Sequence, residues 1–347
     1  MEEKIYITNI REEIESGGAK NPLYLASYRK RERWLPFGLS NEIPWFHLFY
    51  ENDLKYIIPY GLKTLKNRAN DGVTLKDLFW FVACARYLKQ LDKLDINFIY
   101  SFIKECFINS NSTVGFISRP STGSSSQSFP DVHSTFYGLA TLKVINKLGE
   151  FFSSLQNIEI PLKIRNYILN LKNKNGFKHC GNNTCSFCIT EPRSASTYFA
   201  VLSIFLLGDE GEAKRQKIPN KGKESYGTYD YSFVLLLKKF LNVKDINEEE
   251  LYAFNQHQRA DGGYKIGEKV PESDIKETFW VAYTLENYSW LIDYNRGGVF
   301  SYILEKFRSF KPGEDCLNLE KLIDYSRLII LYAHLMENVI SKAEDIL

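Results

Sequence analysis

The chain has 347 residues, of which 44% are hydrophobic and 25% are charged, and its formal net charge is +2. This composition is typical of a globular protein that can bury a core without a disulfide framework, and the small net charge argues against nucleic acid as an obligatory partner. The start of the chain lacks the apolar stretch of a signal peptide, and the longest apolar runs are too short to cross a bilayer. We therefore expect a cytoplasmic protein without a transmembrane segment.

Aromatic residues are unusually frequent, with 24 Phe, 22 Tyr and 5 Trp. Two interpretations of this excess stay open. The rings can fill the core of a protein whose composition reflects an AT-rich genome. Alternatively, they can line a large cavity that holds an apolar or cationic ligand.

Four copies of one unit follow one another along the chain. Each copy has a glycine before an aromatic or β-branched residue, then a polar loop, then a short polar patch that opens an apolar helix. The glycines are Gly72, Gly115, Gly176 and the pair Gly262 and Gly263. Apolar helices are predicted over residues 76–83, 131–138, 193–200 and 274–282, with weaker copies at residues 231–233 and 324–327.

The predicted helices fall into two kinds. The repeated ones are apolar on all sides, which is typical of buried helices, whereas the segments 162–172, 248–258 and 299–307 are amphipathic. This alternation predicts an all-α fold, an α/α toroid of about six inner and six outer helices that form a barrel. The glycines suit turns with positive φ, and Ser or Thr near the helix starts suits N-capping. We expect an N-terminal extension over residues 1–45 and a single toroid domain over residues 46–347.

The run from Gln258 to Tyr264 contains Asp261, Gly262 and Gly263, and it resembles the Q-x-x-D-G-G-F/Y signature of protein prenyltransferase β-subunits and terpenoid cyclases. Together with the repeats, this resemblance covers roughly residues 70–340. It implies the toroid fold and, in the prenyltransferases, a funnel at the inner helix ends that binds an isoprenoid diphosphate. The fold by itself does not imply an activity.

The resemblance also implies a zinc site, which the family builds from an Asp, a Cys two residues later and a distant His. Asp274 matches the zinc Asp, but Lys276 stands at the Cys position, and an ammonium group offers zinc no lone pair. The last repeat has no His at the third ligand position, and His334 comes later in the chain. We therefore expect this zinc site to be absent, with Asp274 as a candidate catalytic residue.

The family surrounds the diphosphate with a His, an Arg and a Lys. Arg193 stands at the His position, and Lys265 and Lys269 lie in the loop that carries the other two, although at a different spacing. Cations beside helix N-termini suit a diphosphate, which can also bring magnesium. Phosphate contact and simple surface solvation both remain open for these three residues.

The second repeat begins with Asp131, Val132, His133, Ser134 and Thr135, and it is similar to two family patterns. In prenyltransferases the run is D-V-R-S-like, so a cationic His133 would orient substrate. In class II terpenoid cyclases the run is D-x-D-D or D-x-D-T, so Asp131 and His133 would form the acid pair, although imidazolium is a weak acid for an unactivated alkene. The structural alternative is that Asp131 and Ser134 cap a helix and that His133 is hydrogen-bonded.

The most distinctive local feature is a cysteine loop, predicted as a candidate metal site at residues 177–190, with potential ligands His179, Cys180, Cys185 and Cys188. Cys-x4-Cys-x2-Cys spacing fits a tetrahedral zinc site. Because neighbouring residues rarely bind one ion together, we expect His179 and Cys180 not to share it and the fourth ligand to be His133, Asp274, water or substrate. A structural zinc clip, a relocated catalytic zinc that activates an acceptor thiol, and unmetallated or redox-sensitive thiols are the three interpretations.

Three functions follow as hypotheses. The first is a prenyltransferase-like enzyme, a transferase that binds an isoprenoid diphosphate in an aromatic funnel and passes the prenyl group to an acceptor. The second is a class II-like terpenoid cyclase, and the third is a non-catalytic toroid that binds a lipid or a protein. An open aromatic funnel would favour an enzyme, and a funnel filled by its own side chains would favour the third function. Residues 2–45 would cap the barrel or contact a helical partner like the prenyltransferase α-subunit.

Overall fold

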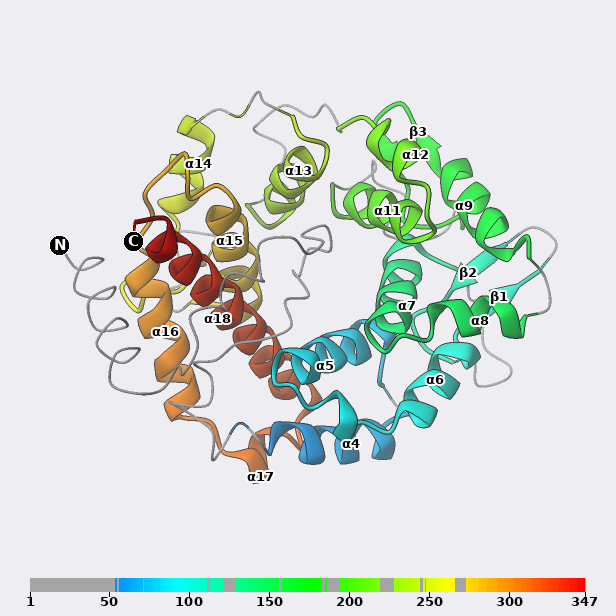
Figure 1. Cartoon of the computed structure of the whole chain (residues 1–347), viewed down its shortest axis with the longest axis horizontal. Helices are drawn as coiled ribbons and strands as arrows, with labels where there is room; N and C mark the ends of the chain where they lie inside the picture. Colours follow the sequence, from blue (N-terminus) through cyan, green and yellow to red (C-terminus); the bar gives the residue numbers. More distant parts are fainter. Residues whose placement is uncertain are drawn as a thin grey trace.

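Two rings of helices make up the computed structural model (Figure 1), which describes residues 54, 56–70, 72–110, 113–120, 129–155, 158–182, 185, 194–218, 228–243, 246, 248–265 and 273–346. The predicted extension over residues 1–45 lies outside the described residues. The inner ring consists of α5 (Leu75–Tyr87), α7 (Val132–Val144), α11 (Ser194–Leu206), α13 (Thr228–Phe240), α15 (Ile275–Asn287) and α18 (Leu319–Ile346). Each inner helix packs against the next in chain order and α18 packs against α5, so the ring closes. The predicted α/α toroid is confirmed.

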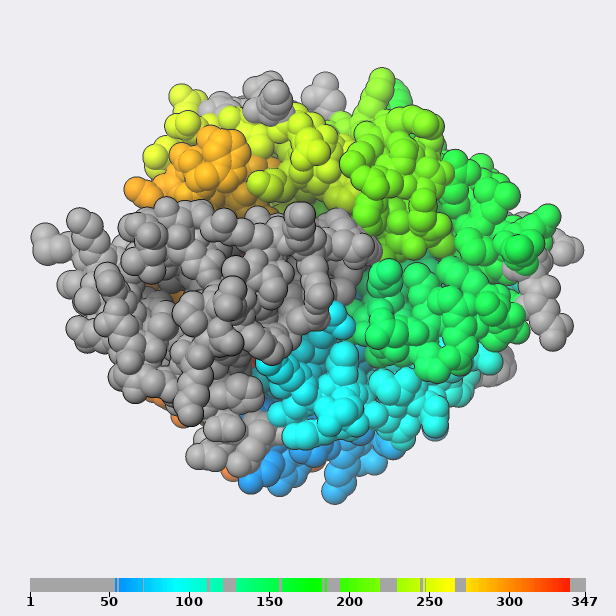
Figure 2. Space-filling view, viewed as in Figure 1, coloured from blue at the N-terminus to red at the C-terminus, as the bar shows by residue number. Residues whose placement is uncertain are grey.

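An outer layer of helices surrounds this ring. Its members are α4 (Ile57–Asn67), α6 (Ile96–Glu105), α8 (Leu148–Ser154), α9 (Ile160–Asn170), α12 (Glu210–Lys214), α14 (Glu248–Asn255), α16 (Arg296–Arg308) and α17 (Pro312–Asp315). The three predicted amphipathic segments correspond to α9, α14 and α16. In space-filling form, the coloured segments follow one another around the molecule in chain order (Figure 2). No described helix is both long enough and apolar enough to cross a membrane.

Short secondary-structure elements connect the two rings. A 3-10 turn, η3, covers Leu91–Lys93. Strand β1 (Phe107–Asn109) pairs antiparallel with β2 (Val114–Phe116), and β3 (Lys172–Asn173) pairs antiparallel with β4 (Gly176–Phe177). The second and third repeat glycines therefore lie in hairpins that follow an outer helix and precede an inner one.

Burial distinguishes the two rings as the sequence pattern predicts. The inner helices α5, α7, α11 and α15 are buried nearly all round, because one side faces the barrel interior and the other faces the outer layer. In contrast, the outer helix α6 buries only one face, which carries Ile99, Phe102 and Ile103. The continuous apolar core therefore lies within and immediately around the inner ring.

The repeated glycines adopt positive φ, as predicted. The values are 106° at Gly72, 154° at Gly115, 123° at Gly176 and 87° at Gly262. Of the pair in the fourth repeat, Gly262 is the one with positive φ. These turns would be strained with any other residue, since a Cβ atom disfavours this backbone region.

Threonine joins each of three turns to the inner helix that follows. The backbone N–H of Phe116 donates to Thr135 Oγ1 at 3.2 Å, and the N–H of Tyr264 donates to Thr278 Oγ1 at 2.8 Å. The same bond joins Phe177 to Thr197 at 3.1 Å. The general expectation of Ser or Thr capping is therefore not met by these three residues, because their hydroxyls accept the N–H of the preceding aromatic residue instead.

For α7 and α15 the helix cap is the residue four positions before this threonine. Asp131 accepts a hydrogen bond from the N–H of Ser134, and Asp274 accepts one from the N–H of Glu277. Capping by a hydroxyl residue occurs at Thr74, which forms a capping box with Asp77 at the start of α5. Carboxylates and hydroxyls serve equally here, because both accept bonds from the exposed first-turn N–H groups.

The inner helices begin at the same end of the barrel. The N–H of Leu75, the first residue of α5, donates to Ser118 O beyond β2 at 2.7 Å. The N–H of Val132, the first residue of α7, donates to His179 O beyond β4 at 2.9 Å. The chain that leaves each hairpin thus passes the N-terminal end of the preceding inner helix and is hydrogen-bonded to it. As a result, the polar patches of successive repeats lie side by side on one rim.

Candidate functional site

A layer of aromatic rings lies inside the barrel close to this rim. Trp80 of α5 contacts Trp280 of α15 with ring centroids 6.0 Å apart, and Phe199 of α11 contacts Trp280 at 6.5 Å. In both pairs another inner helix stands between the two helices that carry the aromatic side chains. The side chains therefore meet in the interior of the barrel. Other rings of this layer, all at most 6% exposed, belong to Phe79, Phe136, Tyr137, Phe233 and Phe279. At this depth the aromatic residues pack as core residues do.

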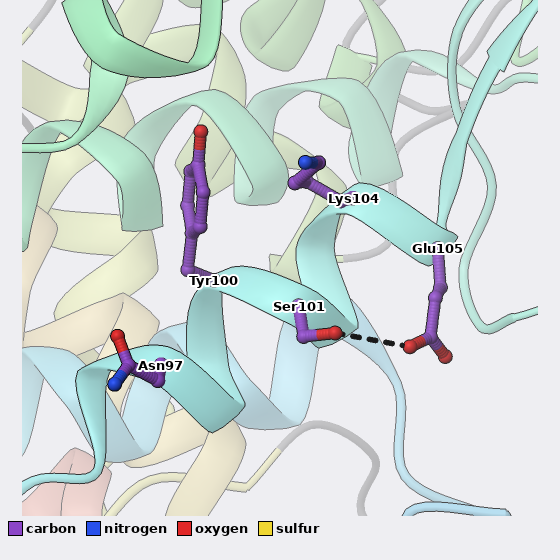
Figure 3. A pocket seen from close by; sticks show the side chains of 5 residues that line it. All are labelled: Asn97, Tyr100, Ser101, Lys104 and Glu105. Atoms are coloured by element: carbon purple, nitrogen blue, oxygen red, sulfur yellow. Dashed lines mark hydrogen bonds between the residues drawn. The ribbon is translucent and has the colours of Figure 1, made fainter. Parts of the chain in front are cut away.

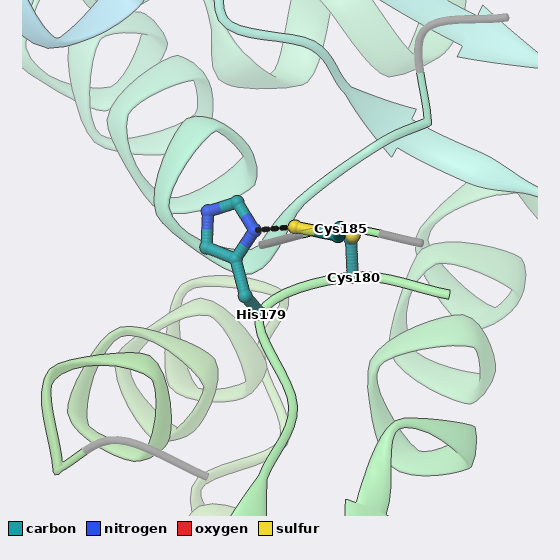
Figure 4. A group of neighbouring side chains, drawn as sticks. All are labelled: His179, Cys180 and Cys185. Carbon is teal, nitrogen blue, oxygen red and sulfur yellow. Dashed lines mark hydrogen bonds between the residues drawn. The ribbon is translucent and has the colours of Figure 1, made fainter. Parts of the chain in front are cut away.

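The cysteine loop brings three potential metal ligands together at the same rim (Figure 4). One ligand atom from each of His179, Cys180 and Cys185 lies within 4.8 Å of the others. His179 Nδ1 is 3.7 Å from Cys185 Sγ. Cys180 is buried, whereas His179 and Cys185 are half-buried. This combination of one imidazole and two thiols is suited to zinc.

Adjacent residues do converge on this site, so the expectation that His179 and Cys180 would not share an ion does not hold geometrically. The N–H of Cys185 donates to Asn182 O at 3.2 Å, which turns the loop back over both side chains. The loop is also anchored below, since Asp131 and Cys180 form an isolated antiparallel bridge. Cys188, the third predicted thiol ligand, lies outside the described residues.

Asp131 approaches the cysteine loop from the start of α7. Its Oδ1 lies 3.4 Å from His179 Nε2 and accepts a bond from the N–H of Ser134 at 2.8 Å. Its Oδ2 accepts the hydroxyl of Ser134 at 2.6 Å. Burial raises the pKa of the Asp131 carboxyl, whereas the charge of His179 and the bonds from Ser134 oppose that rise.

His133 lies beside this pair and faces α11. Its Nε2 is 3.2 Å from Ser196 Oγ, and its ring lies edge-on to the His179 ring at 5.0 Å. The structural alternative for this motif is therefore met for Asp131, which caps α7, and for His133, which is within hydrogen-bonding distance of a hydroxyl. Ser134 is not a cap, since it donates both its N–H and its hydroxyl to Asp131. Ser196 was not predicted as a site residue, although Thr135 and Thr197 align the two repeats and place Ser196 near the start of α11.

Asp274 lies on a different part of the rim, at the start of α15. Helix α13 stands between α15 and α11 in the ring, so Asp274 is not a member of the cysteine-loop cluster. Lys265 Nζ is 3.8 Å from Asp274 Oδ2 and 3.5 Å from Glu277 Oε1. This predicted phosphate ligand thus has two acidic partners. Arg193 and Lys269, the other two, lie outside the described residues.

A second group of cations, not predicted as a group from the sequence, lies at the starts of α5 and α15 and on α18. Lys76 and Lys276 are the second residues of α5 and α15. Arg327 lies over the Trp80 ring at 5.3 Å, and its Nη1 pairs with Asp324 Oδ1 at 2.6 Å. Burial lowers the pKa of Lys276, and the positive charges of Arg327 and Lys76 lower it further. The equivalent positions of Lys76 and Lys276 in two repeats were a signal for this group. Lys276, which stands where the family has its zinc-binding Cys, is thus a member of this cationic group.

Three cysteines outside the cysteine loop, and His334, have structural surroundings. Cys84, Cys106 and Cys316 are fully buried, and burial raises the pKa of each thiol, which makes them poor metal ligands. His334 is half-buried and contacts Tyr283 with ring centroids 4.5 Å apart and the ring planes tilted by 39°. The packing of these four residues indicates a structural role.

A pocket on the outer face is lined by residues of α6 alone (Figure 3). They are Asn97, Tyr100, Ser101, Lys104 and Glu105. The Ser101 hydroxyl donates to Glu105 Oε1 at 3.2 Å, so the polar groups pair with each other along one helix. Nothing in this arrangement points to a ligand, and it contains none of the predicted site residues.

Comparison with family models identifies the description prenyltransferase alpha-alpha toroid domain over residues 78–164 and 152–225. This stretch begins in α5 and includes α7, α11 and the cysteine loop. Comparison with curated protein sequences gives no match. The resemblance read from the repeats is thus confirmed at the level of the toroid superfamily.

Proposed function

We propose that this chain, a member of the α/α-toroid superfamily of prenyltransferases and terpenoid cyclases, binds an isoprenoid diphosphate at the rim where its inner helices begin and transfers the prenyl group to an acceptor. The observation that carries this proposal is the combination, at one rim, of inner-helix N-termini, cationic side chains and an aromatic layer directly beneath. Helix N-termini and cations favour a diphosphate, and aromatic faces favour a prenyl chain and the cation derived from it.

In this proposal the cations hold the leaving group. Lys76, Lys276 and Arg327 would bind diphosphate oxygens, together with Arg193 and Lys269 from the sequence prediction. Asp274 would act indirectly, since it lies beside Lys265. As the allylic C–O bond breaks, the diphosphate leaves with the electron pair, and the preorganised positive charges stabilise it. Magnesium on the diphosphate would add to this charge.

The acceptor would approach from the side of α7 and α11. There His179, Cys180 and Cys185 would hold zinc and leave a fourth position for the acceptor, and zinc lowers the pKa of a thiol that it binds. Cys188 in that fourth position would instead close the site and make it structural. His133, beside Ser196, would orient the substrate. The acceptor atom then forms the new bond to the prenyl carbon and releases its proton to solvent.

Binding of farnesyl or geranylgeranyl diphosphate is the first test. Isothermal titration calorimetry should give saturable binding, and Lys276→Ala should weaken it by at least about tenfold, the equivalent of about 1.4 kcal/mol. Lys104→Ala on the outer helix α6 is the matched control and should bind as the unaltered protein does. Absence of heat and of any thermal shift with every chain length would contradict the proposal.

Metal content is the second test. After washing with a chelator, the protein should retain one zinc per chain, and the double variant Cys180→Ser, Cys185→Ser should lose it. Cys84→Ser changes a core thiol outside the cluster and should keep the metal. Equal zinc content in both variants would refute a site in the cysteine loop, whatever the outcome of the diphosphate titration.

A second candidate function is a non-catalytic toroid that binds a lipid or a protein, and the aromatic layer favours it because its rings meet across the barrel. Binding of a neutral isoprenoid alcohol as tightly as the diphosphate, without turnover, would support this candidate instead. The class II-like cyclase gains less support, since Asp131 lies beside His179 and accepts bonds from Ser134, while His133 lies beside Ser196. Full turnover in His133→Ala would exclude that role for His133.

A further inference from the structure

We infer that Asp131 is a positioning residue for the metal site: its carboxylate orients His179 so that Nδ1, and not Nε2, binds the ion together with Cys180 and Cys185. This inference rests on the zinc site proposed above. It assigns Asp131 a role different from that of a proton donor to substrate. Three features of the structure support it.

The first feature is the orientation of the His179 ring. Nδ1 faces the thiols and is 3.7 Å from Cys185 Sγ, whereas Nε2 faces away from them and is 3.4 Å from Asp131 Oδ1. A neutral imidazole carries one N–H and one lone pair. With the proton on Nε2, the nitrogen beside the carboxylate, the lone pair is on Nδ1, which lies on the side of the thiols (Figure 4).

The second feature is that Asp131 is itself held in place. Ser134 donates its backbone N–H to Oδ1 at 2.8 Å and its hydroxyl to Oδ2 at 2.6 Å. Asp131 is only 8% exposed, so water competes little for the carboxylate. A metal-bound imidazole that donates its second N–H to a carboxylate is the usual outer-shell arrangement, and it makes the imidazole a better ligand.

The third feature is a backbone connection between the carboxylate and the ligands. Asp131 and Cys180 form an antiparallel bridge, and the N–H of Val132 donates to His179 O at 2.9 Å. The first residues of α7 and the ligand loop are therefore one hydrogen-bonded unit. Because Asp131 is the N-cap of α7, the ion would be linked to an inner helix of the barrel through His179 and Asp131.

The variant Asp131→Asn tests this inference. Asn is as good an N-cap as Asp but lacks the negative charge, so α7 should form normally while the zinc dissociation constant rises about 10- to 100-fold. Zinc affinity would be measured on the full chain by competition with a chromophoric chelator. Substitution with Co²⁺ should give the same sulfur-to-cobalt charge-transfer bands in the variant, since the three ligands are retained.

Asp274→Asn is the matched control. Asp274 caps α15 with the same bond, from the N–H of Glu277 at 2.9 Å, but it lies outside the metal cluster. It should leave zinc affinity unchanged, and the metal-free forms of both variants should unfold at the temperature of the unaltered protein. Equal zinc affinity in the two variants would overturn the positioning role alone. Absence of zinc and cobalt binding by the unaltered protein would overturn the metal site and, with it, this inference.

Discussion

Gly262→Ala is expected to destabilise the toroid by about 3 kcal/mol or more. Gly262 has a φ of 87°, and a Cβ atom on it would lie 2.0 Å from Gly298 O and 2.5 Å from Gly298 C. The backbone conformation alone costs an alanine about 1–2 kcal/mol, and relief of an overpacked contact costs about 1–3 kcal/mol more. The clash is with backbone at the start of α16, so no side chain can rotate away to relieve it.

Gly72→Ala separates the two contributions. Gly72 has a similar φ of 106°, but a Cβ atom there would meet nothing within 4 Å. Only the conformational cost of about 1–2 kcal/mol should appear. Urea unfolding followed by circular dichroism would compare the variants. If both lost the same free energy of unfolding, close packing of the turn on α16 would not be the reason for glycine at position 262.

The same turn explains the rest of the Q-x-x-D-G-G signature. The Gln258 side-chain amide donates to Gly262 O at 2.8 Å and to Asn295 O at 3.1 Å, which joins the turn to the start of α16. Asp261 Oδ1 accepts a bond from the N–H of Gly263 at 3.1 Å. The signature is therefore accounted for by structural contacts, and a reaction is not needed to explain it.

Arg296→Ala is expected to lower the free energy of unfolding by about 3–5 kcal/mol, because it would leave the Glu286 carboxylate buried without its counterion. Arg296 Nε is 2.9 Å from Glu286 Oε2, and its Nη2 is 3.0 Å from Oε1. The Glu286 side chain is fully buried and also accepts the hydroxyl of Tyr294. Although burial by itself would lower the pKa of Arg296, the Glu286 carboxylate raises it, so the guanidinium stays charged.

Two further variants make this prediction specific. Lys147→Ala removes an exposed ion pair with Glu150 and should cost less than about 1 kcal/mol. The double variant Arg296→Ala, Glu286→Leu removes both buried charges and should recover part of the stability lost by the single variant. Chemical denaturation would measure all three. A cost for Arg296→Ala as small as that for Lys147→Ala would contradict the burial argument.

Local patterns predicted much of the fold. Apolar helices with residues buried on every side must lie between two layers, and alternation with amphipathic helices then leads to two rings. Positive φ at Gly115 and Gly176 was predictable because glycine is the residue that adopts this backbone region without strain, and it recurs at the same point of each repeat. The caps at Asp131 and Asp274 were also accessible from the sequence, since they need only residues within the first turn.

Contacts between repeats were not predictable in this way. The sequence alone suggested only that Ser or Thr near a helix start caps the helix, and it did not predict the partners of Thr135, Thr197 and Thr278. In the structure their partners are backbone N–H groups 14 to 20 residues earlier in the chain. Likewise, the sequence left open whether the many aromatic residues fill a core or line a funnel. Only the structure shows that Trp80 and Phe199 contact Trp280 inside the barrel, so these side chains pack against one another there.

The sequence by itself determined the helical class, the repeat, the superfamily and the residues of the cysteine loop, because each depends on residue type and on spacing within one repeat. The tertiary structure decided which of these residues meet. It placed Asp131 on the far side of the His179 ring from the thiols, grouped Lys76 with Lys276 and Arg327, and separated Asp274 from the metal ligands. The physical reason is ring closure, since α18 packs on α5 and the order of helices around the barrel then sets every distance between their ends.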